Sequence, residues 1–505
     1  MSHAHARLLR EGLLGVALRV FALVAGLLTS WATIRYLGPH AYGVYVTALA
    51  VASLLAVLAG LGLRSALLPE LHAAHRAADA PASRALMRLG LRATTAAWAA
   101  LALGLALATE PLRAALDAPP DFSAALLLLL PFALFQIWRS LLGGYLGAID
   151  RVGLTFVVDH VVRTFGLLAL LAALWLARAV GLGLPPLPAF TLGLALLELA
   201  LFVALWARHR PPPAPPTPLA PARRARVVAT AAPVAVQATL HATRDVVGKV
   251  LLAGQAAAFV EVGVLGLAFK LADIVPLTQA MLTQSLSPIS VALHQDGRHA
   301  ELRHAYALST LVGLAGGSAV VLLVALWAPY VLPLYGPDFV AAYPPLLVLL
   351  AARLAAVAFG PTTNTLQMIQ RPAVLAPTAA LALGLSVVLN LALIPPYGVL
   401  GVAVASSLAA VAVQLVHAVA LARAVGVHPL GRPYAHFVAA LLLVAGLDAA
   451  FVLTAGPLAG AVLGTALTVP WIVLHLARVV RHHGVTLAEL LPARLARRLA
   501  RRPAA

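Results

Sequence analysis

The sequence predicts an all-α integral membrane protein with about fourteen transmembrane helices. Of the 505 residues, 62% are hydrophobic and 10% are charged, whereas a typical soluble domain has about 45–50% apolar and about 25% charged residues. Residues 304–337 and 373–422 contain no Asp, Glu, Lys or Arg, and such runs are too long for one buried helix of a soluble protein. The runs also lack the alternating polarity of barrel strands.

Each span is placed where a charge, Pro or Gly interrupts an apolar run. The expected helices cover residues 12–34, 41–63, 89–109, 123–146, 154–177, 189–207, 227–253, 262–287, 305–327, 341–360, 374–394, 399–421, 435–454 and 459–478. The first segment is longer than the apolar core of a signal peptide and has no small-residue cleavage site after it, so we expect it to remain in the mature protein.

The distribution of Arg residues predicts the orientation. The termini and every second loop carry most of the Arg residues, whereas the opposite loops carry only Arg35, Arg113 and Arg178. Because Lys and Arg accumulate on the cytoplasmic side, both termini are expected in the cytoplasm. The chain has no cysteine, so cysteine usage indicates no redox compartment.

A Pro-rich and Arg-rich segment, 208–226, divides six predicted helices from eight. An even number of helices in each part gives both the same orientation, so any internal repeat is parallel. Short similar sequences begin three helices: Tyr42-Gly43-Val44, Val262-Gly263-Val264 and Tyr397-Gly398-Val399. The expected domains are an N-terminal lobe at 1–207, a cytoplasmic linker at 208–226, a C-terminal lobe at 227–421, two further helices at 422–478 and a basic cytoplasmic tail at 479–505.

Four motifs resemble those of the Wzx-type bacterial oligosaccharide flippases, members of the multidrug/oligosaccharidyl-lipid/polysaccharide exporter superfamily. The segment Arg35-Tyr36-Leu37-Gly38-Pro39-His40-Ala41-Tyr42-Gly43-Val44-Tyr45 is similar to the first hairpin of that family. Three further segments resemble the family. They are Asp245 with Glu261-Val262-Gly263-Val264, the loop Tyr335-Gly336-Pro337-Asp338-Phe339, and Asn390 with Pro395-Pro396-Tyr397-Gly398-Val399-Leu400-Gly401. The chain departs from it in the Pro-rich linker and in using Arg almost to the exclusion of Lys.

The resemblance implies two six-helix lobes around a central cavity and two additional C-terminal helices. It implies a transporter of the bacterial inner membrane and not an enzyme. The expected substrate is a polyprenyl-diphosphate-linked oligosaccharide, a repeat unit of O-antigen, capsule or exopolysaccharide, moved from the cytoplasmic to the outer leaflet by alternating access. The expected partners are this lipid-linked glycan, membrane lipid, and glycan polymerase and export machinery. No cofactor, metal or nucleic acid is expected.

Basic residues inside the spans are the candidates for binding the diphosphate, because an unpaired cation at depth needs a cavity or a partner. The predicted ligands, each roughly 10–18 Å inside a helix, are Arg19, Arg163, Arg244, Lys270 and Arg353. Arg139 and Lys249 lie nearer an interface, and we interpret them as snorkelling to the headgroups.

Structural ion pairing is the competing explanation for several of these cations. Asp159 with Arg163, Asp245 with Lys249, and Lys270 with Asp273 are one helical turn apart. Arg19, Arg244 and Arg353 have no acidic residue at that spacing, which leaves a facing helix, a hydrated cavity or a bound anion. The buried carboxylates Asp159, Asp273 and Glu198, and also Asp448, are candidates for coupling transport to Na⁺ or protons, and simple charge balance explains them equally well.

Two other functional classes compete with a lipid flippase. A small-molecule exporter of the same superfamily would favour an acidic or aromatic cavity, which the buried basic residues do not suggest. A membrane glycan polymerase or ligase would need a large external loop, and the longest one expected is about 110–122. Lys249 does not sit in a Walker A loop, so the energy for transport must come from an ion gradient or from the concentration difference of the substrate.

Overall fold

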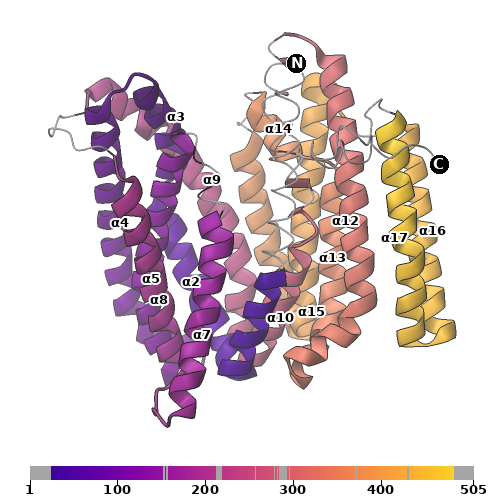
Figure 1. The fold of residues 1–505 in the computed structure, drawn as a ribbon, viewed down its shortest axis with the longest axis horizontal. Coiled ribbons are helices and arrows are strands. Elements are labelled where there is room, and N and C mark those ends of the chain that lie inside the picture. The colour runs from indigo at the N-terminus through magenta and orange to yellow at the C-terminus, as the bar shows by residue number, and fades with distance from the viewer. Residues whose placement is uncertain are drawn as a thin grey trace, which may run out of the picture. The chain divides into compact units, whose positions relative to one another are not determined.

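The structure is a computed structural model in which nearly all described residues are helical. It describes residues 24–482 except 150, 152–153, 155–156, 212–218, 256–257, 278, 281–282, 284–289, 291–292, 295, 370–373 and 429–430. The predicted ligand Arg19, the centre of the Pro-rich linker and most of the basic tail lie outside the described residues. The chain divides into two compact units (Figure 1).

The N-terminal unit contains Ala25–Leu267 and Ala376–Ser406. After a helix over residues 24–37, its elements are α2 (Pro39–Gly60), α3 (Leu63–Arg76), α4 (Ala80–Ala115), α5 (Pro120–Ala148), the π-helix η1 (Val158–Val162), α7 (Arg163–Ala179), α8 (Pro186–His209), α9 (Pro221–Ala253), the start of α10 (Phe259–Ala272) and the first part of α15 (Leu375–Val425). Proline opens α2, α5, α8 and α9, where its missing N–H costs no helical hydrogen bond. The Asp79 side chain caps α4 by accepting a hydrogen bond from the Ala82 N–H at 2.9 Å.

The core of this unit forms where α2, α3, α4, α5 and α8 pack together. Its most buried side chains include Leu67, Leu86, Leu142 and Leu146. Two indole N–H groups are satisfied inside it: that of Trp98 donates to the Leu130 carbonyl at 3.0 Å and that of Trp138 to the Thr95 hydroxyl at 3.0 Å. The apolar packing and the satisfied polar groups together fix the positions of the helices that carry the site described below.

The C-terminal unit contains the described residues of Ala268–Leu375 and Ser407–Ala505. Its elements are the end of α10 (Phe259–Ala272), α12 (His299–Tyr335), the 3₁₀ helix η2 (Pro337–Ala342), α13 (Tyr343–Ala358), α14 (Thr362–Met368), the second part of α15 (Leu375–Val425), α16 (Arg432–Ala455) and α17 (Pro457–His482). One core cluster forms around Leu302, Tyr306, Leu366 and Leu421. The Tyr306 hydroxyl donates to the Phe359 carbonyl at 2.7 Å.

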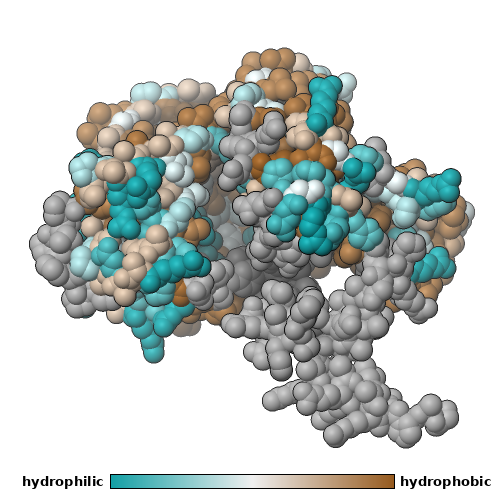
Figure 2. All heavy atoms as spheres, turned by 90° about the horizontal axis from the view of Figure 1, so that it is seen from above, coloured by the Kyte–Doolittle hydropathy of each residue, from teal (hydrophilic) through white to brown (hydrophobic). Residues whose placement is uncertain are grey.

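The outer surfaces of the helices are those of a membrane protein. Exposed large hydrophobic residues are spread over both units, with Leu107, Leu176, Leu442 and Leu453 among the most exposed. Figure 2 shows hydrophilic residues gathered on the helix ends that face the viewer and hydrophobic residues on the flanks. Within the described residues, nine helices are long and apolar enough to span a membrane.

The described part of each of the fourteen predicted spans includes a helical segment. The count of nine is lower than fourteen for several reasons. Residues 12–23 of the first span lie outside the described residues, α15 contains two predicted spans, α7 has 17 residues and α10 has 14, and the part of α9 within the predicted span carries Gln237, His241, Arg244, Asp245 and Lys249.

Two local predictions are wrong. Residues 64–76, expected to form a loop, form α3. The span expected at 262–287 is interrupted, because α10 ends at Ala272 and a turn covers 273–276; Pro276 disfavours helical backbone before it and donates no hydrogen bond. The two spans expected at 374–394 and 399–421 are confirmed as two helices within α15, separated by a kink at the non-helical residue Gly398 (φ 51°, ψ −124°).

Two of the three similar motifs pack against each other within the N-terminal unit. A Cβ on Gly43 of α2 would lie 1.6 Å from the Phe259 carbonyl oxygen, at the start of α10. A Cβ on Gly263 of α10 would lie 3.4 Å from the Gly43 Cα. Only glycine allows such a close approach of two backbones, so these motif glycines form the contact between α2 and α10.

Candidate functional site

A network of four charged side chains lies inside the N-terminal unit. The Arg139 Nε of α5 donates to the Glu198 Oε2 of α8 at 2.7 Å, and the Arg139 Nη1 pairs with the Asp159 carboxylate of η1. The Arg163 Nε lies 2.7 Å from the other Glu198 oxygen. The side chains of Glu198 and Arg139 are only 1% and 10% exposed, whereas that of Arg163 is 38% exposed. The two positive and two negative charges balance.

The π-helix explains why Asp159 and Arg163 hold different partners. The Arg163 N–H bonds to the Val158 carbonyl, five residues earlier, so the turn that carries Asp159 is wider than an α-helical turn. The two residues are therefore out of α-helical register, and Asp159 reaches α5 while Arg163 reaches α8. Structural pairing of these groups is confirmed, but with partners on neighbouring helices rather than one turn away.

A cavity of about 400 Å³ with both polar and apolar walls lies beside this network. Helices α2, α3, α5 and α9 and the π-helix line it, and its polar side chains are Ser53, Arg64, Ser65, Gln136, Arg139, Ser140 and Asp159. The Gln136 Oε1 is buried and forms no hydrogen bond with any described residue. The Arg64 Nη1 donates weakly to the Ser140 hydroxyl at 3.5 Å, and among the described residues no carboxylate pairs with Arg64. The cavity therefore offers one guanidinium whose charge is not neutralised.

The turn between α2 and α3 places Arg64 at this cavity. Leu61 (φ 50°) and Gly62 (φ 64°) are both left-handed, which ends α2 and starts α3 in a new direction. A Cβ on Gly62 would lie 2.6 Å from the Ala231 carbonyl oxygen of α9, so glycine allows both the turn and the approach of α9.

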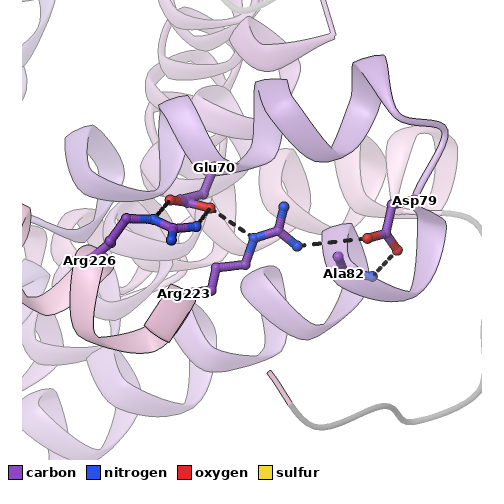
Figure 3. A network of polar contacts seen from close by, with 5 residues as sticks. All are labelled: Glu70, Asp79, Ala82, Arg223 and Arg226. Atoms are coloured by element: carbon purple, nitrogen blue, oxygen red, sulfur yellow. Dashed lines mark hydrogen bonds and ion pairs between the residues drawn. The ribbon is translucent and has the colours of Figure 1, made fainter. Parts of the chain in front are cut away.

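A second ion-pair network fixes the start of α9 on α3 and α4 (Figure 3). Glu70 accepts hydrogen bonds from the Nε atoms of Arg223 and Arg226, both at 2.8 Å. The Arg223 Nη1 lies 3.7 Å from the Asp79 carboxylate that caps α4. The hydrogen bonds from Arg226 and Arg223 hold the pKa of Glu70 below its usual value. These contacts hold the helix that follows the Pro-rich linker, and with it one wall of the cavity.

In the C-terminal unit, the predicted ligand Arg353 is paired. Its Nη2 lies 2.7 Å from the Asp273 carboxylate, which follows the last residue of α10. The sequence left a facing helix as one explanation for Arg353, and the structure confirms a partner from a neighbouring segment.

Arg244 is paired as well, with the adjacent Asp245 at 2.9 Å. The sequence analysis considered only acidic residues one helical turn away and therefore did not identify this partner. Lys270 is exposed on α10. The predicted ligands are thus divided between the two units, with Arg163 and Arg244 in the N-terminal one and Lys270 and Arg353 in the other, and their convergence on one site stays a prediction.

Arg139 does not snorkel, so that interpretation is wrong. It points into the unit and binds two carboxylates. The sequence analysis also missed Gln136 and Arg64, which directly follows the expected span 41–63. The signal that could have drawn attention to Gln136 and Arg139 is their spacing of one helical turn in an otherwise apolar span.

No family model matches the chain, and no curated protein matches its sequence. Solved structures do match. The lipid II flippase MurJ in an inward closed conformation has a TM-score of 0.71 at 12% identity, covering 93% of this chain and 99% of MurJ. The chain has the fold of MOP-superfamily transporters.

Two further MOP transporters have the same fold. An inward-facing MATE family multidrug resistance transporter has a TM-score of 0.66 at 12% sequence identity. The match covers 80% of this chain and 94% of the transporter. A MOP superfamily transporter from Pyrococcus furiosus, with a binding pocket of reverse polarity, has a TM-score of 0.61 at 13% sequence identity. The match covers 84% of this chain and 96% of the transporter. These matches confirm the predicted fold class, an all-helical, multi-pass membrane protein built from two lobes and two further helices. The exact domain limits stay a prediction.

Proposed function

We propose that this protein is a flippase that moves a polyprenyl-diphosphate-linked oligosaccharide from the cytoplasmic to the outer leaflet of the bacterial inner membrane. Both termini lie in the cytoplasm in this proposal, and transport follows alternating access between the two lobes. The MOP fold and the four Wzx-like motifs support it. The structural likeness to a lipid II flippase supports a lipid-linked glycan as the substrate class, with a glycan polymerase and export machinery as partners.

Arg64 is the observation that carries the proposal. A diphosphate diester has about two negative charges at neutral pH, and removing it from water requires fixed positive charge beside it. Arg64 lines a cavity of about 400 Å³ and no described carboxylate neutralises it. Arginine suits this role because its planar guanidinium pairs with two phosphate oxygens and stays ionised.

The ligands predicted from the sequence are also part of this proposal. Arg163, Arg244 and Arg353 each hold a carboxylate in this state. A phosphate that binds them must therefore either share the guanidinium with Glu198, Asp245 or Asp273 or replace that carboxylate, because a guanidinium has five N–H donors. We place Arg19 and Lys270 in the same group of diphosphate ligands, and Asp159, Glu198 and Asp273 as the carboxylates that balance them or couple transport to an ion.

A small-molecule exporter is the second candidate, because the carboxylate of Asp159 lines the same cavity and MATE transporters have the same fold. Such an exporter would bind an organic cation at Asp159 rather than an anion at Arg64. A glycan polymerase or ligase has less support, since the solved structures with this fold named above are transporters.

Binding of a polyprenyl diphosphate to the purified full-length protein tests the proposal. Losing a charge-assisted hydrogen bond costs about 1.5–3 kcal/mol, so Arg64→Ala should weaken binding by about 10–100-fold. Arg76→Ala is the matched control, because Arg76 is an exposed residue at the other end of α3. Equal affinity of the Arg64→Ala variant and the wild type would refute the site. Tighter binding of organic cations, lost in Asp159→Asn, would favour the exporter.

A further inference from the structure

The charge balance of the buried network has a consequence for ion coupling. Glu198 and Asp159 are the two carboxylates of the charged network in the N-terminal unit, and their side chains are 1% and 31% exposed. Carboxylate oxygens are the ligands that hard cations prefer. Both are already neutralised, by Arg139 together with Arg163. A dissolved cation that entered this cluster would leave one positive charge uncompensated in a buried place, which is strongly unfavourable.

Arg139 occupies the position between the two carboxylates. Its Nε reaches Glu198 on α8 and its Nη1 reaches Asp159 on the π-helix, so one guanidinium joins three segments. It is also nearly fully buried. A cation held on the chain in this way cannot leave, whereas a dissolved ion binds and dissociates.

We infer that Arg139 is a tethered cation that fills the place a dissolved monovalent cation such as Na⁺ would otherwise take between Asp159 and Glu198. Arg139 is thus a positioning residue that sets ion specificity: coupling to Na⁺ does not pass through these two carboxylates. The inference rests on the geometry of the network and not on the proposed substrate, so its test is independent of the test of the flippase proposal.

A further oxygen atom lies on the wall of the adjoining cavity. The Gln136 Oε1, one helical turn before Arg139, is buried, and none of the described residues forms a hydrogen bond with it; Gln136, Arg139 and Asp159 line the same cavity. Removing the guanidinium would therefore leave the two carboxylates, with this amide group on the wall of the same cavity as Asp159. This is a set of ligands typical of a site for a hard cation.

Replacing Arg139 by a neutral side chain should create a Na⁺ site that the wild type lacks. The melting temperature of the full-length protein in detergent is measured in NaCl and in choline chloride at equal ionic strength. We expect no difference between the two salts for the wild type. Arg139→Met and Arg139→Gln should melt at lower temperature in choline chloride and recover by several degrees in NaCl, because a ligand that binds only the folded state stabilises it.

Two control variants separate this role from a merely structural one. Arg139→Lys keeps a tethered charge and should show no response specific to Na⁺. The double variant Arg139→Met with Glu198→Gln restores the charge balance and should lose the response. A Na⁺-specific stabilisation of the wild type that Glu198→Gln abolishes would overturn the inference. Folded neutral variants that melt equally in both salts would also overturn it, as would neutral variants that fail to fold even in high NaCl.

Discussion

Glu198→Gln is the substitution that tests the buried network most directly. Glu198 is 1% exposed and each of its carboxylate oxygens lies 2.7 Å from a guanidinium nitrogen. The substitution keeps the size of the side chain but removes one negative charge. The network then has two arginines and one carboxylate, and the positive charge of Arg163 has lost its only described partner.

The structure sets the expected magnitude. Breaking a buried ion pair by removing one partner costs about 3–5 kcal/mol, because the other charge is left uncompensated. Arg163 is more than a third exposed, so water screens part of its charge, and Arg163→Gln alone should cost about 1 kcal/mol or less. The double variant Glu198→Gln with Arg163→Gln restores neutrality, because Arg139 keeps Asp159, and should recover at least half of the loss.

The free energy of unfolding of the three variants and the wild type is measured by denaturant titration in detergent micelles, with tryptophan fluorescence as the signal. The result that would refute the reasoning is a Glu198→Gln variant within about 1 kcal/mol of the wild type, the range of an exposed ion pair. Additive losses in the double variant would also contradict it, since they would mean that charge balance does not stabilise the network.

Two further predictions concern the contacts that hold the helices in place. Gly43→Ala should destabilise the protein by about 1–3 kcal/mol, because its Cβ would collide with the Phe259 carbonyl oxygen. Gly104→Ala is the control: the new methyl group has open space around it, so the melting temperature should stay unchanged or rise. Equal melting temperatures of the two variants would contradict the contact. The ion pairs of Glu70 should make stability depend on pH. Because the folded pKa of Glu70 lies below its ordinary value of 4.5, the stabilisation is present above that value and is lost as the pH falls through the folded pKa. Glu70→Gln should flatten this part of the pH profile of the melting temperature, and an unchanged profile would refute the assignment.

The spans could be predicted from the sequence because apolar runs bounded by charge leave few alternatives in a membrane protein. The local interruptions could not. The turn after Ala272 and the π-helix at Val158–Val162 depend on packing around a few residues rather than on the length of a hydrophobic run. The helix α3 is short and contains Arg64, Glu70 and Arg76, so its composition alone does not distinguish it from a charged loop.

The buried charges themselves were predicted, but not their partners. The sequence rule considers acids one turn away, whereas Arg139 and Glu198 are 59 positions apart and meet only because α5 packs on α8. Which face of each helix points inward decides such pairs, and mean hydropathy does not determine this in helices that are apolar on all sides. The motif glycines were more informative: Gly43 and Gly263, singled out as parts of similar motifs, form a contact.

Translocation by the purified protein in proteoliposomes is the measurement that tests the proposed function most directly. A fluorescently labelled polyprenyl-diphosphate glycan is placed in one leaflet and its arrival in the other is followed with a membrane-impermeant quencher. The proposal predicts translocation by the wild type and by Arg76→Ala, and an initial rate at subsaturating substrate about tenfold or more lower for Arg64→Ala, the effect of one lost charge-assisted hydrogen bond. Export of organic cations without translocation of the diphosphate-linked glycan would contradict it.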